Sequence, residues 1–311
     1  MSITVVGSIA YDRVKTPFGE RERMLGGAAT HFALAASFFD EVNVVGPVGD
    51  DFGDAELEVL ATRGTQIGDV ERVPGGQTFF WHGQYGWDLN DRETLATELG
   101  VFAEFEPKLS ERSAAADVLF LANIQPDLQR AVREQCEAAR FSALDSMNLW
   151  IDTARDSLVS VIERVDCVIL NDAELRQLTE KPNLLSAARQ VLSFGPSVVV
   201  AKQGEYGAAL VTADSFFALP AYPLETVVDP TGAGDTFAGG FLGYVARRLD
   251  DGLSDETLRQ GMAYGTALAS FNVEEFGAER VTRLTADEVH GRVAELRRIT
   301  HFEEAPVELT T

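Results

Sequence analysis

The sequence predicts an α/β fold, with a doubly wound and mostly parallel sheet that helices cover on both faces. Three observations support this prediction. Short β-branched or apolar runs recur along the chain of 311 residues, and segments of helical period separate them. The runs are also apolar throughout instead of alternating, which is typical of strands that are buried on both faces of a parallel sheet.

The predicted elements alternate along the chain. Strands are expected at residues 3–7, 42–46, 118–122, 142–145, 167–170 and 197–201. Helices are expected at residues 28–39, 126–140 and 152–164, and another helix follows a Gly-rich turn and ends near residue 248. We expect residues 1–311 to form one domain built on this sheet.

Two segments interrupt the alternation. Residues 12–24 are polar and contain Pro17 and Gly19, whereas residues 77–87 alternate and are rich in aromatic side chains. Both are predicted to be β-ribbons outside the main sheet. We expect them to form a small β lid over about residues 11–25 and 75–92.

Alternation would place one set of aromatic side chains on a single face of the lid, with Phe80 and His82 on the other face. The set comprises Phe79, Trp81, Tyr85 and Trp87. That face could pack inside the lid, pair with the lid of a second copy, or stack on a nucleobase or a sugar. Because a small sheet has little core of its own, a homodimer through the lid is one expectation.

The composition excludes several classes of partner. The chain has 26 Lys and Arg against 49 Asp and Glu, a formal net charge of −23. Such a surface repels nucleic-acid phosphates and anionic membranes, so neither is expected as a ligand. A high-salt cytoplasm and a GC-rich genome would each explain this acidity.

Other features point to an ordinary cytoplasmic protein. Two cysteines and four scattered histidines show neither a disulfide framework nor metal-ligand spacing. The N-terminus lacks the basic and apolar regions of a signal peptide, and no apolar stretch reaches membrane-spanning length. We therefore expect the protein in the cytoplasm.

The most informative segment is residues 227–241, where a Gly-rich turn leads into a helix of small residues. The first turn of a helix presents unpaired N–H groups, and glycines let the backbone approach an anion closely. No Gly-Lys-Ser/Thr of a Walker A loop occurs in the chain, and Phe237 stands where a dinucleotide fingerprint needs its third glycine. The turn is therefore a candidate phosphate site of another kind.

Asp235 lies in this candidate anion site, although a carboxylate would repel an anion. The residue makes sense as a base that takes a proton from an attacking hydroxyl while backbone amides hold the transferring phosphoryl group. The alternative is that Asp235 only caps the helix N-terminus, where Asp is favoured.

Four segments of the chain resemble motifs of the ribokinase-like (PfkB) carbohydrate kinases, and they follow one another along the chain as they do in that family. Residues 26–31 with 45–53 resemble the N-terminal signature of that family, and residues 229–235 resemble its C-terminal signature. Residues 171–174 resemble its Asn-x-x-Glu motif, and residues 202–208 resemble its Lys-x-Gly-x-x-Gly segment. The resemblance spans about residues 3–297 and implies a ribokinase-like fold, ATP and Mg²⁺.

The resemblance also implies roles for the reacting centre. Asp235 would be the general base, and the backbone amides of Gly232, Ala233 and Gly234 would form the anion hole for the γ-phosphate. Asn171 and Glu174 would organise Mg²⁺ and its waters, because Mg²⁺ keeps several waters and needs few direct protein ligands. The alternative for this pair is a helix N-cap with a charged first turn.

For the nucleotide and the ions, Gly204 and Gly207 would shape a turn beside the nucleotide. Lys202 would contact phosphate, or it would be a strand-end charge without a ligand. Asp229 and Thr231 match positions that help to bind a monovalent cation, such as K⁺, in some relatives.

On the acceptor side, the resemblance implies that Asp12 binds substrate hydroxyls and that Gly26 and Gly27 let the substrate approach the backbone. The family commonly has Asn where this chain has His31. His31 would then either bind an acceptor hydroxyl or serve as a structural histidine, and this departure leaves the acceptor open. Asp145, Asn148 and Trp150 follow a strand end, where open α/β sheets gather ligands.

We therefore expect an ATP-dependent kinase that phosphorylates a hydroxyl of a sugar or a sugar-like molecule, with Asp235 as the base. A nucleoside kinase of the same family is the alternative. A catalytically silent nucleotide-binding module and a dehydrogenase are further alternatives, although the dehydrogenase lacks a glycine fingerprint after the first strand. Basic residues near the lid would favour a phosphorylated acceptor unless they are only solvated: Arg13, Lys15, Arg21, Arg23 and Arg92.

Overall fold

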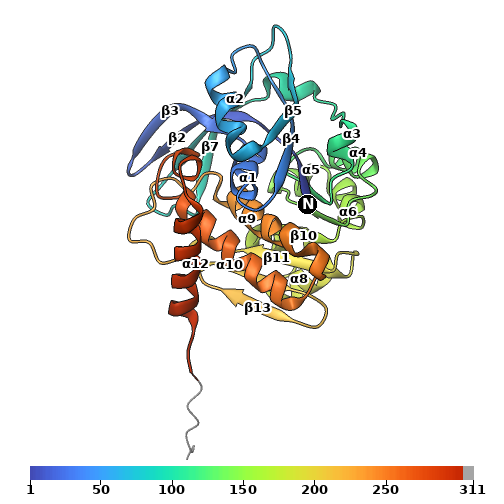
Figure 1. Cartoon of the computed structure of the whole chain (residues 1–311), viewed down its shortest axis with the longest axis vertical. Coiled ribbons are helices and arrows are strands. Elements are labelled where there is room, and N and C mark those ends of the chain that lie inside the picture. The colour runs from blue at the N-terminus through green and yellow to red at the C-terminus, as the bar shows by residue number, and fades with distance from the viewer. Residues whose placement is uncertain (304–311) are drawn as a thin grey trace, which may run out of the picture.

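A nine-stranded sheet organises the computed structural model, which describes residues 1–303 (Figure 1). The strands in spatial order are β13 (Phe216–Leu219), β12 (Ala208–Val211), β11 (Val198–Lys202), β10 (Cys167–Asn171), β9 (Phe141–Leu144), β8 (Val118–Leu121), β1 (Ser2–Val6), β4 (Glu41–Val48) and β5 (Gln66–Arg72). All pairs from β11 to β5 are parallel, and β12 and β13 are antiparallel. The predicted mostly parallel sheet is therefore confirmed.

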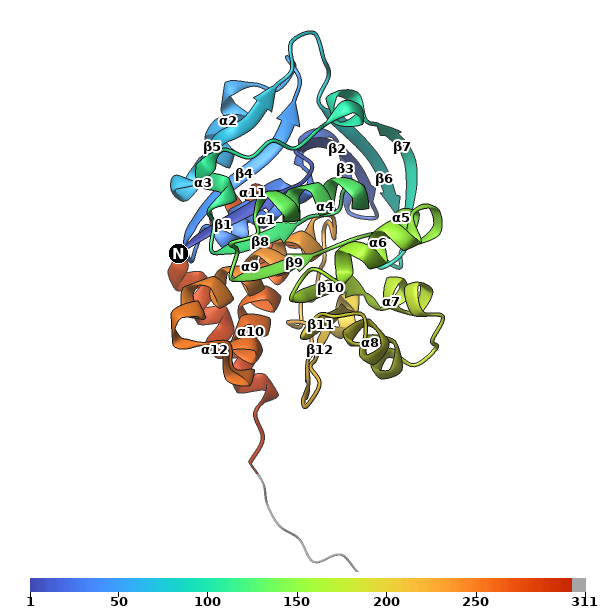
Figure 2. The same ribbon diagram turned by 90° about the vertical axis from the view of Figure 1, so that its right-hand side faces the viewer.

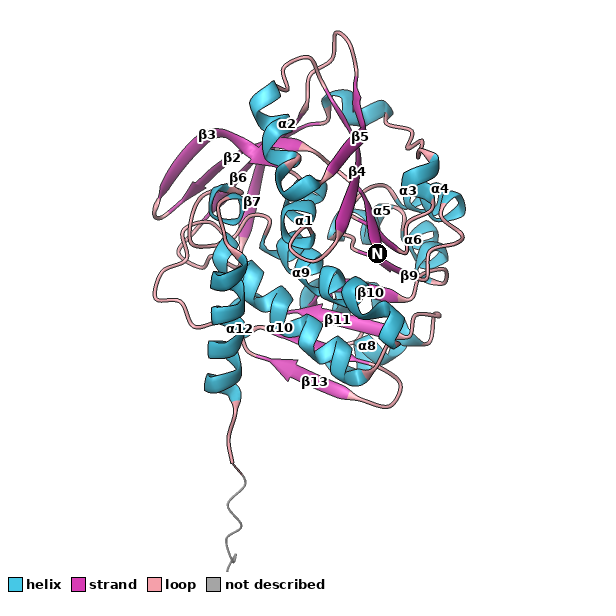
Figure 3. Ribbon diagram, viewed as in Figure 1, coloured by secondary structure: helices cyan, strands magenta, loops and turns pink. Residues whose placement is uncertain are grey.

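Helices pack on both faces of this sheet, as Figures 2 and 3 show. One face carries α1 (Ala28–Ala36), α9 (Ala233–Arg248) and α10 (Asp255–Asn272); the other carries α4 (Pro126–Gln135), α6 (Arg155–Ile162), α7 (Asp172–Thr179) and α8 (Leu184–Leu192). Neighbouring strand residues divide between the two cores: Val44 belongs to the first and Val45 to the second. This division explains why the strands are apolar throughout.

The remaining helices are shorter or lie at the periphery: α2 (Asp54–Leu60), α3 (Glu111–Ala114), α5 (Asn148–Thr153), α11 (Glu279–Thr282) and α12 (Ala286–Thr300). The predicted helix 152–164 is in fact two helices, because the chain leaves helical geometry at Ala154 between α5 and α6 (φ −143°). Within residues 1–303, none of the helices combines the length and apolarity that crossing a membrane requires. Residues 304–311 of the predicted domain lie outside the described residues.

A second, four-stranded sheet stands beside the first in the order β3 (Gly19–Gly26), β2 (Ala10–Thr16), β6 (Phe79–Tyr85) and β7 (Arg92–Glu98). We call it the small sheet. Strands β2 and β6 are parallel, and the other two pairs are antiparallel. Both predicted ribbons belong to it. The predicted lid segment 75–92 ends too early, however, because the small sheet continues through β7 to Glu98. β7 is polar and mostly exposed, so the sequence shows no apolar pattern there.

The predicted common aromatic face is wrong in part. Trp81 and Tyr85 do share a face and pack with Phe276. Phe79 packs instead on Phe102, with ring centroids 5.6 Å apart, and Trp87 follows the strand and is 88% exposed. A register shift after His82 and the end of β6 at Tyr85 break the simple alternation.

The opposite face of the small sheet is charged where β2 and β3 pair. Arg13, which lies between two inward-facing residues of β2, forms ion pairs with Glu20 and Glu22 at 2.7 and 2.9 Å. The aromatic packing of Trp81 and Tyr85 is thus satisfied within the chain. A homodimer through this sheet stays a prediction.

Candidate active site

The Gly-rich turn begins α9 with a backbone that only glycine adopts easily. Gly232 is the N-cap residue with φ 74°, and a Cβ there would lie 2.3 Å from Nε2 of His31. The N–H groups of Gly232 and Gly234 have no acceptor among residues 1–303, whereas the N–H of Ala233 donates to the Pro230 carbonyl at 3.2 Å. The turn therefore offers two free amides of the three that the resemblance implies for the anion hole.

Asp235 is the third residue of α9, so the N-cap alternative is wrong: Gly232 holds that position. Burial and then Asp145 raise the pKa of Asp235, Lys202 and Arg92 oppose them, and the result is a pKa of about 7. A carboxylate whose pKa lies near neutrality is matched to the work of a general base.

Lys202 connects this carboxylate to the ends of three adjacent strands. It ends β11, and its Nζ donates to Oδ2 of Asp145, just after β9, at 2.9 Å. Its Nζ also lies 3.1 Å from the position that a Cβ of Gly234 would take. Burial alone would lower the pKa of Lys202, but Asp145, Glu174 and Asp235 raise it. The lysine is thus a buried, paired cation beside the turn, and not an isolated strand-end charge.

Asn171 and Glu174 form a capping box at the start of α7. Oδ1 of Asn171 accepts from the N–H of Glu174, and Oε2 of Glu174 accepts from the N–H of Asn171, both at 2.8 Å. The N-cap alternative is therefore confirmed, and it leaves Oε1 of Glu174 free of this box. Burial and then Asp145 raise the pKa of Glu174 to about 7.

The residues near Lys202 suit Mg²⁺ that keeps most of its waters. In the described part of the chain, no three His, Cys, Asp or Glu residues are grouped as metal ligands. Buried carboxylates of Asp145 and Glu174 nevertheless stand beside the turn, and oxygen ligands are those that Mg²⁺ takes. A protein site with few direct ligands fits an ion that is bound together with substrate phosphates.

Asp12, Gly26 and Gly27 meet where the small sheet joins the main domain. Oδ2 of Asp12 fills the space that a Cβ of Gly26 would need, at 2.0 Å, and the backbone N–H of Gly27 (φ 95°) lowers the pKa of the same carboxylate. Burial raises the pKa of Asp12 to about 8, with Asp229 and Asp235 adding to the shift. The acceptor-side carboxylate and the candidate base therefore face one site.

Aromatic side chains border this acceptor side. Asp12 pairs with Trp81 across β2 and β6, and the guanidinium of Arg92 lies 5.7 Å from the Trp81 ring centroid. Arg92 also lowers the pKa of both Asp12 and Asp235, so its charge faces the site. In the sequence, Arg92 stood out only as one of the basic residues near the predicted lid.

His31 lies beneath the Gly-rich turn and not on the acceptor side. It is 2% exposed, and its Nδ1 lies 3.1 Å from Oδ1 of Asn272. Burial lowers its pKa to about 4, so the ring is neutral near pH 7. This placement corresponds to the structural alternative. Asn272, the fully buried last residue of α10, was not found from the sequence because buried asparagines carry no motif.

Asp229 and Thr231 have partners within the chain. Asp229 accepts from the N–H groups of Thr231 and Gly277, both at 2.9 Å, and the Thr231 hydroxyl lies 3.2 Å from the Tyr85 hydroxyl. Burial raises the pKa of Asp229. These contacts explain both residues without a cation, and the monovalent cation stays a prediction.

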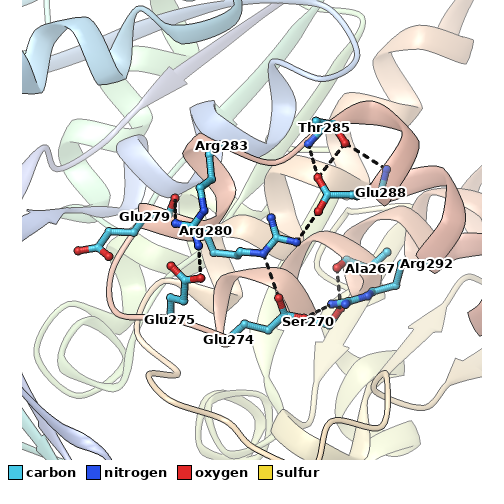
Figure 4. A network of polar contacts seen from close by, with 10 residues as sticks. All are labelled: Ala267, Ser270, Glu274, Glu275, Glu279, Arg280, Arg283, Thr285, Glu288 and Arg292. Atoms are coloured by element: carbon cyan, nitrogen blue, oxygen red, sulfur yellow. Dashed lines mark hydrogen bonds and ion pairs between the residues drawn. The ribbon is translucent and has the colours of Figure 1, made fainter.

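Ion pairs fix the segment that supplies Gly277 (Figure 4). Glu274 pairs with Arg280 at 3.1 Å and with Arg292 at 2.7 Å, and Arg280 also pairs with Glu288 at 2.7 Å. The network joins the end of α10 to α11 and α12. Because Glu274, Arg280 and Arg292 are only partly exposed and share several pairs, the network holds this segment more firmly than isolated exposed pairs would.

The predicted nucleotide turn meets the small sheet. Gly204 and Gly207 have φ 57° and 98°, and Cβ atoms there would lie 2.1 Å from Oδ1 of Asn90 and 2.0 Å from the Leu219 carbonyl oxygen. Asn90 belongs to the loop between β6 and β7, and the N–H of Glu205 donates to its Oδ1 at 3.4 Å. The loop between β6 and β7 thus spans from the acceptor side to the nucleotide turn.

Two other strand-end candidates have different surroundings. Asn148 begins α5, and Nε1 of Trp150 donates to Oδ1 of Asn123 at 3.1 Å. Of the three residues noted after β9, only Asp145 joins the cluster around Lys202.

Comparisons with known proteins agree with this arrangement. The pfkB family carbohydrate kinase profile matches residues 2–283. A cytidine kinase from Thermococcus kodakarensis is 31% identical over 254 residues, which cover 79% of this chain and 89% of that protein. A ribokinase from Lactococcus lactis is 25% identical over 292 residues, covering 89% and 92%. The crystal structure of a Methanocaldococcus jannaschii nucleoside kinase superposes with a TM-score of 0.76 at 21% identity, covering 94% and 98%.

The last comparison shows the ribokinase-like fold, and the profile spans nearly the whole described chain. The chain therefore belongs to the pfkB family of carbohydrate kinases, whose members are phosphotransferases that act on hydroxyl groups.

Proposed function

We propose that the protein transfers the γ-phosphoryl group of ATP to a hydroxyl of a nucleoside, with Asp235 as the general base. One observation carries the proposal: Asp235 stands between the Lys202 cluster at the Gly-rich turn and an acceptor side bordered by Trp81. A base in this place lies next to both the phosphate that is transferred and the hydroxyl that receives it.

Each residue would have a separate task in the reaction. Asp235 takes the proton of the attacking hydroxyl, while the N–H groups of Gly232 and Gly234 and the ammonium of Lys202 orient the γ-phosphoryl group. Phosphoryl transfer needs little covalent chemistry from a protein, so positioning and charge stabilisation supply most of the rate. When Mg²⁺ is bound, it neutralises phosphate charge, and Asp145 with Glu174 would hold it through water.

A nucleoside is favoured over a free sugar because the acceptor side combines two kinds of group. Asp12 offers a carboxylate for sugar hydroxyls, and Trp81, which pairs with Asp12 across β2 and β6 and is only partly buried, offers a ring for a flat base. The T. kodakarensis relative is a cytidine kinase, which supports the same choice. Cytidine is therefore the first acceptor to test.

A free pentose is the second candidate. Asp12, Gly26 and Gly27 would serve a ribose without a base equally well, and the L. lactis relative is a ribokinase. We also infer that the small sheet acts as a lid, because its loop already reaches the nucleotide turn through Asn90.

The test is ADP release with Mg-ATP over cytidine, uridine, adenosine, inosine, ribose, deoxyribose and fructose, with the product identified by mass spectrometry. We expect a nucleoside to have the highest kcat/KM. Preference for a pentose would replace the nucleoside by the second candidate, and binding of ATP without ADP release for any acceptor would contradict the kinase proposal.

Two tryptophan variants test the stacking surface. Trp81→Leu should raise KM for the nucleoside by roughly 2- to 12-fold, the equivalent of an aromatic contact of about 0.5–1.5 kcal/mol, and should leave KM for ATP unchanged. Trp87→Leu is the matched control, because Trp87 is 88% exposed and lies beyond β6. Equal effects of the two substitutions would show that Trp81 does not contact the base.

A further inference from the structure

Three buried residues, His31, Thr236 and Asn272, are joined by hydrogen bonds next to the Gly-rich turn. We propose that Asn272 and His31 are positioning residues for phosphoryl transfer, which hold the turn so that its free amides point at the γ-phosphoryl group. This inference rests on the proposed function, since it assigns a task to the same turn. Neither residue would touch a substrate.

Asn272 fastens the turn at two points. Its Nδ2 donates to the Thr231 carbonyl oxygen at 2.8 Å, and its Oδ1 accepts from the Thr236 hydroxyl at 3.1 Å. Thr231 precedes Gly232, and Thr236 lies in the first turn of α9. A single buried amide therefore links the segment before the anion site to the helix after it.

The bond to Thr231 fixes the direction of one catalytic amide. The Thr231 carbonyl and the Gly232 N–H belong to one planar trans peptide, so the two groups point in opposite directions. Since the carbonyl points inward to Asn272, the N–H of Gly232 points away from the protein interior. The same N–H has no acceptor among the described residues, which leaves it available to a phosphate oxygen.

His31 supports the turn through its ring. Because Nδ2 of Asn272 donates to Thr231, its Oδ1 is the acceptor that faces His31, and the imidazole must carry its proton on Nδ1. Nε2 is buried without a hydrogen-bond partner in the described chain, and it lies 2.3 Å from the position of a Cβ on Gly232. The ring thus fills the space below Gly232 and excludes any side chain at that residue.

The end of α10 provides a firm base for this group. The Val273 carbonyl accepts from the Val228 N–H at 2.8 Å, and the Gly277 N–H donates to Asp229 at 2.9 Å. Glu274, between them, is held by the ion pairs with Arg280 and Arg292 (Figure 4). The residues before the turn, Val228 and Asp229, are therefore attached to the segment that directly follows Asn272.

Small displacements matter at such a site, since a misplacement of about 1 Å can lower a rate on the order of 10²-fold. Asn272→Ala should therefore lower kcat by about 10- to 100-fold with little change in KM for the acceptor. His31→Phe keeps a ring below Gly232 but loses the Nδ1 bond, and it should lower kcat less than Asn272→Ala does.

Asn43→Ala is the matched control. Asn43 is 2% exposed and donates from Nδ2 to the Ile3 carbonyl at 3.4 Å and the Thr4 hydroxyl at 3.3 Å, within the sheet and not at the turn. Thermal melting should show a loss of stability in both asparagine variants. Only Asn272→Ala should lose kcat when both proteins are assayed well below their melting temperatures. A fall in kcat that is equal in the two variants, or absent from Asn272→Ala, overturns the proposal.

A binding measurement separates this inference from the proposed function. Calorimetry should show that wild type binds a non-hydrolysable Mg-ATP analogue more tightly than Mg-ADP, and that Asn272→Ala and His31→Phe lose this preference while retaining affinity for Mg-ADP. If the preference persists in both variants, only the positioning role fails. If wild type binds neither nucleotide, the proposed function fails and the positioning role with it. Should Asn272→Ala not fold, Thr236→Val removes one of its bonds and is read in the same way.

Discussion

The position of Asp235 predicts a pH dependence that can be calculated. Burial and Asp145 raise the pKa of this carboxyl to about 7, so only its ionised fraction can act as base. That fraction is about one tenth at pH 6 and about nine tenths at pH 8, which predicts a roughly tenfold rise in kcat/KM between these values. An ordinary aspartate, with its pKa near 3.8, would give a flat profile over the same range.

Two substitutions should move the profile in opposite directions. Lys202 lowers the pKa of Asp235, so Lys202→Met should shift the rising limb to higher pH. Asp145 raises that pKa, so Asp145→Asn should shift the limb to lower pH. Both residues also lie at the candidate phosphate site, and the absolute rate should fall in both variants. The midpoint of the limb, and not the rate, is therefore the quantity to compare.

The assay is ADP release at constant ionic strength from about pH 5.5 to 9, with Mg²⁺ saturating and Mg-ATP well below KM, because kcat/KM reports the free enzyme. Asp250→Asn serves as a control, since Asp250 is an exposed acid that pairs with Arg140. The control should leave the midpoint in place. A flat wild-type profile, or shifts of the same sign in Lys202→Met and Asp145→Asn, would refute Asp235 as the titrating base.

Four further outcomes are expected from three variants. Asp235→Asn should lower kcat on the order of 10²–10⁴-fold while retaining Mg-ATP binding, and normal turnover would exclude it as base. The same variant should melt at a higher temperature than wild type above pH 7: a carboxyl with a raised folded-state pKa contributes stability that is full below its unfolded pKa and is lost as pH rises through about 7. Glu174→Gln should raise the Mg²⁺ concentration for half-maximal rate, and an unchanged requirement would remove Glu174 from that role. Arg63→Leu should lower the free energy of unfolding in urea by about 1–3 kcal/mol without changing kcat, because the partly buried guanidinium donates to the Leu34 and Thr282 carbonyls. Stability equal to wild type would show that these bonds contribute nothing.

Sequence patterns identified the buried parallel strands, but they missed other buried elements, among them α8 and α10, and the margins of the fold. The six predicted strands correspond to β1, β4, β8, β9, β10 and β11, which are buried on both faces and therefore apolar throughout. The strands β5, β7, β12 and β13 were missed. β5, β7 and β13 are edge strands, which tolerate polar or exposed residues: β7 contains Arg92, Glu93 and Glu98 and only one half-buried side chain. β12 was missed although it is apolar and buried. The break at Ala154 was missed because alanine favours helices, and only the tertiary packing of α5 and α6 imposes the bend.

The site shows the same division. Lys202 and Glu174 stand at or just after strand ends, and Asp235 follows the Gly-rich turn, all in recognisable motifs. Parallel topology brings the ends of β10 and β11 to one edge of the sheet. Asn272 and Arg92 come from a helix terminus and from the small sheet, and neither stands in a motif. His31 shows a third case, since its position in a substrate-binding signature could not reveal that the ring turns beneath Gly232.

The carboxylates of the site affect which form of the nucleotide can bind. Asp12, Asp235 and Glu174 have raised pKa values because each is buried near other carboxylates, and Lys202 and Arg92 offset only part of that repulsion. A free nucleotide polyanion would add to the repulsion, whereas its magnesium complex would bring two positive charges to the same place. We therefore infer that these buried carboxylates discriminate against uncomplexed ATP at the site. On the proposed function, a carboxylate at the Gly-rich turn is compatible with phosphate binding because Mg²⁺ neutralises part of the phosphate charge.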